Sequence, residues 1–196
     1  MNRYRICLAV PPDYPHSACF SEIIRLLWLS IRDNGFECDF TINSPARDRI
    51  NILIGYHLVP FQPPWSQVDT VIWQLEQLDD SPTQWNSLRE AHLRHARMVW
   101  DFTPDNLTFL SRKGIGAQLL VPGHHPAMKT IRPAPEPDID ILFYGSVGER
   151  RRVLLDRLSE SFRLQALFGV YGEKRDSWIA RSRLVINIHH YPAQQF

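Results

Sequence analysis

Short runs rich in β-branched and aromatic residues alternate with helical segments, and this alternation restricts the fold more than any other feature of the sequence. Strands are predicted at residues 5–10, 36–43, 50–56, 70–75, 98–102 and 117–121. Helices are predicted at residues 18–34 and 85–97 and from residue 103 onward. Strands that alternate with helices in this way are typical of a parallel sheet covered on both faces. The sequence therefore predicts an α/β fold with Rossmann-like lobes.

A proline-rich segment divides the chain. Prolines stand at positions 126, 133, 135 and 137, where they interrupt any regular element. Beyond them, strands are predicted at 139–144, 163–168 and 184–189, with helices at 149–161 and 173–182. This order is half of an ordinary nucleotide-binding domain. The predicted organisation is an N-terminal lobe at 1–122, a connector at 123–137 and a short, incomplete C-terminal lobe at 138–196.

The short lobe has too few strands to close its sheet. Three parallel strands leave two edges unpaired, and parallel sheets normally have both faces buried. We therefore expect one of three arrangements. The lobe packs against the first lobe, a second copy or another protein completes its sheet, or strands of a longer domain are missing. In the last case the chain is expected to be inactive alone.

Charge and hydropathy exclude several classes of protein. The 22 Lys and Arg nearly balance the 21 Asp and Glu, so the net charge of +1 provides no field that would attract nucleic acid. No apolar run approaches the roughly 18 residues of a membrane span, and Pro11-Pro12 interrupts the first apolar run. We expect no transmembrane segment and a cytoplasmic location. Cys7, Cys19 and Cys38 lack CxxC spacing and are expected to be reduced thiols.

Two glycine-containing loops of the second lobe are candidate phosphate-binding loops, because glycine lets the backbone approach a ligand and the free amides of a helix start favour an anion. The first loop and the helix start after it offer Gly145, Ser146, Gly148, Arg150 and Arg151. The second offers Gly169, Tyr171, Gly172 and Arg175. The carboxyl ends of parallel strands meet at one edge, so both loops are expected on one rim of a cleft. The alternative is a turn followed by a solvated basic helix start.

The third strand of this lobe ends in Asn187-Ile188-His189-His190-Tyr191. Adjacent residues of a strand point to opposite faces, and no cysteine or carboxylate accompanies the two histidines at ligand spacing. We therefore predict no metal site here. Asn187 and His189 are instead candidate hydrogen-bonding residues for a ligand in the cleft.

Three polar residues of the first lobe follow or end predicted strands: His57, Glu76 and Asp101. Each is expected to project toward a crevice at the carboxyl edge of the sheet. A histidine or carboxylate in that place can act as a general base. Residues at strand ends also serve as helix caps or hinge contacts, and this alternative stays open for all three.

Several segments together resemble a bacterial family of two-lobed, GT-B-type glycosyltransferases related to the CgeB-like spore-maturation proteins. The resemblance lies in residues 51–57, 73–78, 99–106, 140–152, 167–176 and 185–191. It implies a C-terminal lobe that binds a nucleotide-sugar donor, an N-terminal lobe that binds an acceptor of unknown identity, and transfer without a metal or other cofactor. Members of such a family continue beyond the last of these segments, so the resemblance also implies a truncated donor lobe.

Under this resemblance, helix-start amides and arginines stabilise the departing nucleoside diphosphate. If transfer inverts the anomeric centre, a base of the first lobe such as His57 deprotonates the acceptor hydroxyl. A rival hypothesis is a noncatalytic module that binds a nucleotide or a partner protein, or one subunit of a split transferase. A dinucleotide-dependent oxidoreductase is disfavoured, because no strand-linked GxGxxG is followed by an acidic residue about twenty positions later.

Overall fold

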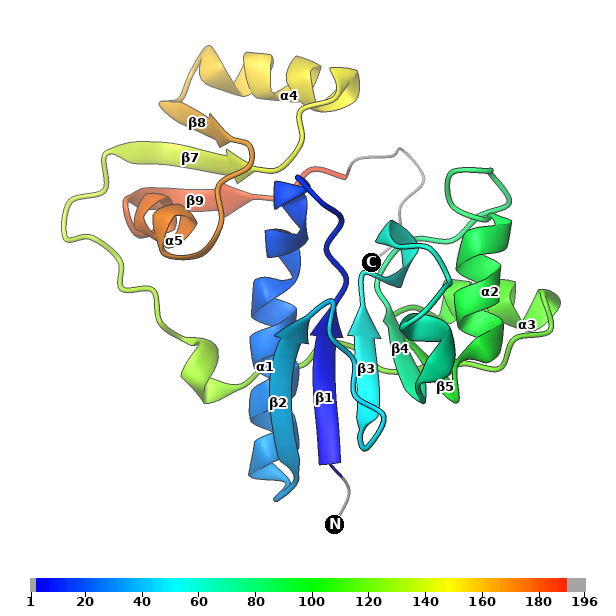
Figure 1. Ribbon diagram of the computed structural model, residues 1–196. Coiled ribbons are helices and arrows are strands. Elements are labelled where there is room, and N and C mark those ends of the chain that lie inside the picture. Colours follow the sequence, from blue (N-terminus) through cyan, green and yellow to red (C-terminus); the bar gives the residue numbers. More distant parts are fainter. Residues whose placement is uncertain (1–2, 190–196) are drawn as a thin grey trace. The chain divides into compact units, whose positions relative to one another are not determined.

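The computed structural model describes residues 3–189 and divides the chain into two compact units, Met1–Met128 and Lys129–Phe196 (Figure 1). The boundary lies inside the proline-rich segment. Each unit contains a parallel sheet with helices, so the predicted α/β, Rossmann-like class is confirmed. Among residues 3–189, no helix is both long and apolar enough to cross a membrane.

The described part of the first unit forms a six-stranded parallel sheet in the order β2-β1-β3-β4-β5-β6. The strands are β1 (Arg3–Leu8), β2 (Glu37–Ile42), β3 (Ile50–Ile54), β4 (Thr70–Gln74), β5 (Met98–Asp101) and β6 (Gln118–Leu119). The α-helices are α1 (Ser21–Asp33), α2 (Ser87–His95) and α3 (Pro104–Arg112). Short 3₁₀ helices are η1 (Pro15–Phe20), η2 (Tyr56–Leu58), η3 (Trp65–Gln67) and η4 (Pro126–Met128).

Helices cover both faces of this sheet, because the chain moves in opposite directions on the two sides of β1. On one face, Ile24 and Leu27 of α1 share a buried cluster with strand residues such as Ile52. On the other face, Leu93 of α2 and Leu110 of α3 are buried in a second cluster. The sheet is thus the middle layer of the first unit.

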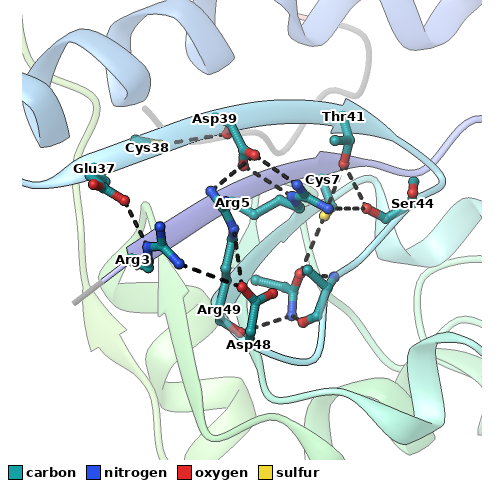
Figure 2. A network of polar contacts seen from close by, with 12 residues as sticks. Arg3, Arg5, Cys7, Glu37, Cys38, Asp39, Thr41, Ser44, Asp48 and Arg49 are labelled. Atoms are coloured by element: carbon teal, nitrogen blue, oxygen red, sulfur yellow. Dashed lines mark hydrogen bonds and ion pairs between the residues drawn. The ribbon is translucent and has the colours of Figure 1, made fainter. Parts of the chain in front are cut away.

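Near β2 the second face is covered by polar side chains and by the segment that joins β2 to β3 (Figure 2). Arg5 donates hydrogen bonds of 3.0 and 2.7 Å to Asp39, its register partner on β2, and one of 3.3 Å to the Ser44 carbonyl. Buried Asn51 holds the same segment through two 2.8 Å hydrogen bonds with the Ala46 backbone. Polar contacts therefore replace a helix at this part of the sheet.

The described part of the second unit forms a smaller parallel sheet in the order β8-β7-β9. Its elements are β7 (Ile139–Tyr144), α4 (Glu149–Ser159), β8 (Leu164–Leu167), α5 (Gly172–Ala180) and β9 (Ser182–Ile186). The central strand β7 is buried over most of its length, whereas Leu184 and Val185 on the edge strand β9 are exposed. This sheet is less well covered than that of the first unit.

Most predicted elements differ from the observed ones by a few residues at their ends, and three of these differences have a clear structural basis. The helix predicted at 18–34 begins as η1 at Pro15 and becomes α-helical at Ser21. The helix predicted at 85–97 starts at Ser87, because the Asn86 side chain accepts from the Arg89 amide and caps it. The strand predicted at 184–189 lies at Ser182–Ile186, where β9 pairs with β7, so His189 follows the strand instead of ending it.

Candidate functional site

The first unit offers a site where the strand order reverses. Strands β1 and β3 are neighbours, but the chain continues from β1 to β2 on one side and from β3 to β4 on the other. Open α/β sheets bind ligands at the carboxyl ends of strands beside such a reversal. His57 follows β3 and Glu76 follows β4 at this edge.

Gly55 sets the direction of the chain after β3. Its φ is +76°, a left-handed conformation that favours glycine, and a Cβ there would lie 3.2 Å from the Ala9 carbonyl oxygen. The turn is followed by η2, in which Tyr56 is buried and His57 is partly exposed. Glycine at this position therefore allows the tight turn from β3 into η2.

His57 and Glu76 form a pair. The His57 Nε2 lies 3.6 Å from Glu76 Oε1, and the side chains are 11% and 34% exposed. Burial, followed by the positive charge of Arg89, lowers the pKa of His57 to about 4. Burial raises the pKa of Glu76, and Arg89 opposes that rise. At neutral pH the imidazole is therefore uncharged, and its lowered pKa makes it a weaker base than an exposed histidine.

A buried network holds Glu76 in place. The Gln74 side chain accepts from the Glu76 amide at 2.9 Å and donates to the Glu76 carbonyl. Asn106, in the first turn of α3, donates to the same carbonyl at 2.8 Å and accepts from the Leu78 amide at 3.0 Å. Gln74 and Asn106 are both buried. The backbone on both sides of the Glu76 side chain is thereby fixed.

Asp101 does not project into a crevice as expected; it is fully buried within this network. Its carboxylate accepts from the Thr103 amide at 3.0 Å, from Asn106 at 3.0 Å and from Gln74 at 3.2 Å. Burial raises the pKa of Asp101, and these hydrogen bonds oppose that rise. Asp101 therefore acts in the way expected for a capping residue, because it accepts from the Thr103 amide just before α3. It also orients Gln74 and Asn106, the two side chains that hold Glu76.

Arg89 adds a positive charge near the pair. It lies in the first turn of α2 and is only 7% exposed. Its Nη1 donates a 3.4 Å hydrogen bond to Gln84. The charge of Arg89 influences Tyr56, His57 and Glu76. The site therefore combines a neutral imidazole, a carboxylate and a buried guanidinium.

In the second unit, the predicted phosphate-binding loop lies between β7 and α4. Gly145 has a φ of +145°, and Gly148 forms the N-cap of α4 without a side-chain cap. Arg151 donates to the carbonyls of Ser146 at 2.7 Å and of Ile188 at 2.9 Å, and Arg150 donates to the His189 carbonyl at 2.6 Å. Both arginines thus bind backbone oxygens and connect this loop to the chain after β9.

The second glycine loop lies between β8 and α5. Gly169 and Gly172 have φ values of +68° and +56°, and Tyr171 is the N-cap of α5. Arg175 contacts Asp176 through hydrogen bonds of 3.0 and 2.5 Å and lies 5.5 Å from the centre of the Tyr144 ring. The two loops therefore meet at the carboxyl edge of the sheet.

The structure brings together two sets of the predicted site residues, and four further residues lie next to them. His57 and Glu76 come together, as do the segments that contain Gly145, Arg151 and His189. Exposed Asn187 follows β9, and His190 and Tyr191 lie outside the described residues. The sequence analysis missed Tyr56, Gln74, Arg89 and Asn106. Two of these residues have a recognisable sequence signal: Gln74 is a polar residue at the end of an apolar strand, and Asn106 is a polar residue in the first turn of a helix. Arg89 has no such signal.

No group of three or more His, Cys, Asp or Glu side chains that could hold a metal ion occurs in residues 3–189. A comparison of the chain with protein-family models gives no match, and neither does a comparison with curated proteins. The function is therefore inferred from the geometry of each unit.

Proposed function

We propose that the chain is a glycosyltransferase of the GT-B type, or the greater part of one. In this proposal the second unit binds a nucleotide-sugar donor, and the first unit binds the acceptor. The observation that carries it is the His57–Glu76 pair, 3.6 Å apart at the carboxyl edge of a parallel sheet.

The reaction proposed is a direct displacement. The acceptor hydroxyl oxygen attacks the anomeric carbon of the donor sugar, the bond from that carbon to the diphosphate oxygen breaks, and the nucleoside diphosphate leaves. His57 accepts the hydroxyl proton on Nδ1, because its Nε2 faces Glu76. The carboxylate then stabilises the imidazolium that forms. One displacement of this kind inverts the anomeric centre.

The second unit supports donor binding through α4. The first amides of a helix lack partners within the helix, and no side chain caps the start of α4. These amides and the positive end of the helix dipole favour a phosphate group. Exposed Arg150 lies in the same turn. The donor diphosphate is therefore proposed to bind at Gly145–Arg151 without a metal ion.

The exposed edge of the second sheet favours a second candidate. Leu184 and Val185 of β9 are 53% and 38% exposed, which is unusual for a parallel strand. A partner protein or a second copy that pairs with β9 would cover them. In this alternative the chain is a noncatalytic nucleotide- or partner-binding module, or one subunit of a split transferase.

Calorimetric titration with a panel of nucleotide sugars and bare nucleoside diphosphates, followed by a donor-turnover assay, separates the two candidates. The transferase proposal expects binding and turnover. It also expects His57→Gln to lower turnover about 10²- to 10⁴-fold while donor binding is kept. His124→Gln, a substitution at an exposed histidine of the first unit, is the matched control and should change neither.

Nucleotide binding without turnover would favour the noncatalytic module, and light scattering would then show whether the chain self-associates. Full turnover by His57→Gln would remove His57 from the mechanism. No binding of any nucleotide would contradict the donor site and would leave only the partner-binding form of the second candidate.

A further inference from the structure

Arg89 is a buried cation without an anionic partner. It is 7% exposed, its side-chain hydrogen bond goes to the neutral Gln84, and no carboxylate of residues 3–189 lies within ion-pair distance of it. A guanidinium removed from water is unfavourable unless it is paired. An anion supplied by a ligand would remove this penalty.

The Tyr56 hydroxyl is a second group that needs a partner. Tyr56 is 1% exposed, and within residues 3–189 its hydroxyl makes no hydrogen bond of normal geometry, although the Arg89 side chain lies close enough to interact with it. The ring packs edge-on against His92, with centroids 5.8 Å apart. His92 lies three residues after Arg89 on α2, so both face the same side of the helix. Burial raises the pKa of Tyr56 and Arg89 opposes the rise, as expected for neighbours.

The hydrogen-bond donors and charges at Arg89, Tyr56 and Glu76 indicate which kind of anion would bind. A guanidinium offers parallel donors that match the two oxygens of a carboxylate, and Tyr56 adds one more donor. Glu76 lies near enough to sense the charge of Arg89. Its own negative charge disfavours a doubly charged phosphate more than a singly charged carboxylate. The surroundings therefore suit a carboxylate.

We propose that Arg89 and Tyr56 form a binding site for a carboxylate group of a small-molecule ligand. The guanidinium donates two hydrogen bonds to the carboxylate, and the Tyr56 hydroxyl donates a third. If the proposed function is right, this ligand is the acceptor, and its carboxylate holds it beside His57. The site itself does not depend on that function.

The site can be tested on the full chain with acetate and benzoate as probes. The Arg89 Nε–H resonance in ¹H–¹⁵N spectra is expected to shift saturably with either probe, and the thermal midpoint is expected to rise. Sodium chloride and inorganic phosphate at the same ionic strength should do neither. Arg89→Met is expected to raise Kd for the probes at least tenfold, and Tyr56→Phe about threefold to tenfold.

Arg94→Met is the matched control, because Arg94 lies on the exposed side of α2 and pairs with Glu90; it should leave probe binding unchanged.

Arg89→Met should fold with an unchanged or higher thermal midpoint, because it removes an unpaired buried charge. A lower midpoint than that of Arg94→Met would overturn the proposal by showing that Arg89 has a structural partner. The proposal is also overturned if neither probe gives a saturable shift, if only phosphate does, or if Arg89→Met retains the response. The titration contains no nucleotide sugar, so its failure leaves the His57→Gln turnover test standing, and the reverse also holds.

Discussion

The two units hold their candidate binding loops in different ways. In the first unit, the loop after β4 is fixed by buried side chains, since Gln74 and Asp101 are fully buried and Asn106 is nearly so. In the second unit, the loop after β7 is fixed by Arg151, which reaches backbone carbonyls from a partly exposed position. One loop depends on a buried network and the other on contacts near the surface.

This difference indicates different tolerances to change. A buried polar network is costly to break, because each group left without a partner has already lost its hydration. A group near the surface can exchange a lost hydrogen bond for one to water. We therefore expect the first unit to present a rigid His57–Glu76 pair, and the second to present a loop that adjusts to a ligand.

The largest effect is expected from breaking the buried network. Asn106→Leu removes hydrogen bonds to the Leu78 amide, the Glu76 carbonyl and Asp101. We expect the free energy of unfolding to fall by about 3 kcal/mol, since each unsatisfied buried group costs about 1–3 kcal/mol. Denaturant unfolding measures this. Asn34→Ala, at an exposed helix end, is the control and should stay within about 0.5 kcal/mol. A loss below about 1 kcal/mol for Asn106→Leu would contradict the rigid network.

A pH titration of stability tests the burial of His57. Its pKa is about 4 in the folded chain against an ordinary value of 6.5, so the unfolded chain takes up this proton first as the pH falls. The folded state therefore loses stability between about pH 6.5 and pH 4, by roughly 2–3 kcal/mol. His57→Gln lacks this component. The raised pKa values of Glu76 and Asp101 act in the opposite direction, but both proteins contain these groups.

The measurement is the difference in unfolding free energy between wild type and His57→Gln at pH 7.5 and at pH 4.5. On going to the lower pH, the unfolding free energy of the wild type should fall by more than that of the variant. Parallel stability curves for the two proteins would show that His57 titrates normally in the folded chain.

A smaller effect is expected at Arg151. Arg151→Ala removes hydrogen bonds to Ser146 and Ile188 and a contact with the Phe143 ring, whose centroid lies 5.3 Å away. A loss of about 1–2 kcal/mol in the second unit would speed hydrogen exchange of the β7 amides about 5- to 30-fold. Mass spectrometry of peptides from 139–144 measures it. Exposed Arg152→Ala should leave exchange unchanged; equal effects would remove the special role of Arg151.

The course of the chain could be predicted because it depends on local pattern. The helix predicted at 18–34 is observed as η1 and α1, and the helix predicted from residue 103 onward is observed as α3, where the Thr103 side chain accepts from the Asn106 amide at 3.1 Å. Parallel pairing then placed His57 and Glu76 at one edge. These inferences needed only the periodicity and the order of elements.

The network and Arg89 could not be predicted because they depend on contacts between distant segments. Asp101 and Gln74 meet across 27 positions of sequence, and Arg89 reaches the Tyr56 neighbourhood from another helix. An aspartate at a strand end has the same sequence pattern whether it faces solvent or closes a buried network. Only the packed arrangement distinguishes a base from a residue that positions one.

The smallest effect concerns the ion pairs between β1 and β2, which show within the first unit what contacts near the surface contribute. Arg5 and Asp39 are register partners whose side chains are 19% and 38% exposed, whereas those of Arg3 and Glu37 are 50% and 55% exposed. A double-mutant cycle with Arg5→Ala and Asp39→Ala should give a coupling of about 0.5 kcal/mol, because cross-strand charge pairs are weak in water. The same cycle on Arg3 and Glu37 should give less and should lose it in high salt, since exposed charges are screened. The coupling at Arg5 and Asp39 could instead be as large as the Asn106→Leu effect. Polar contacts near the surface would then stabilise the first unit as strongly as buried ones do, and the contrast between the two units would lose its physical basis.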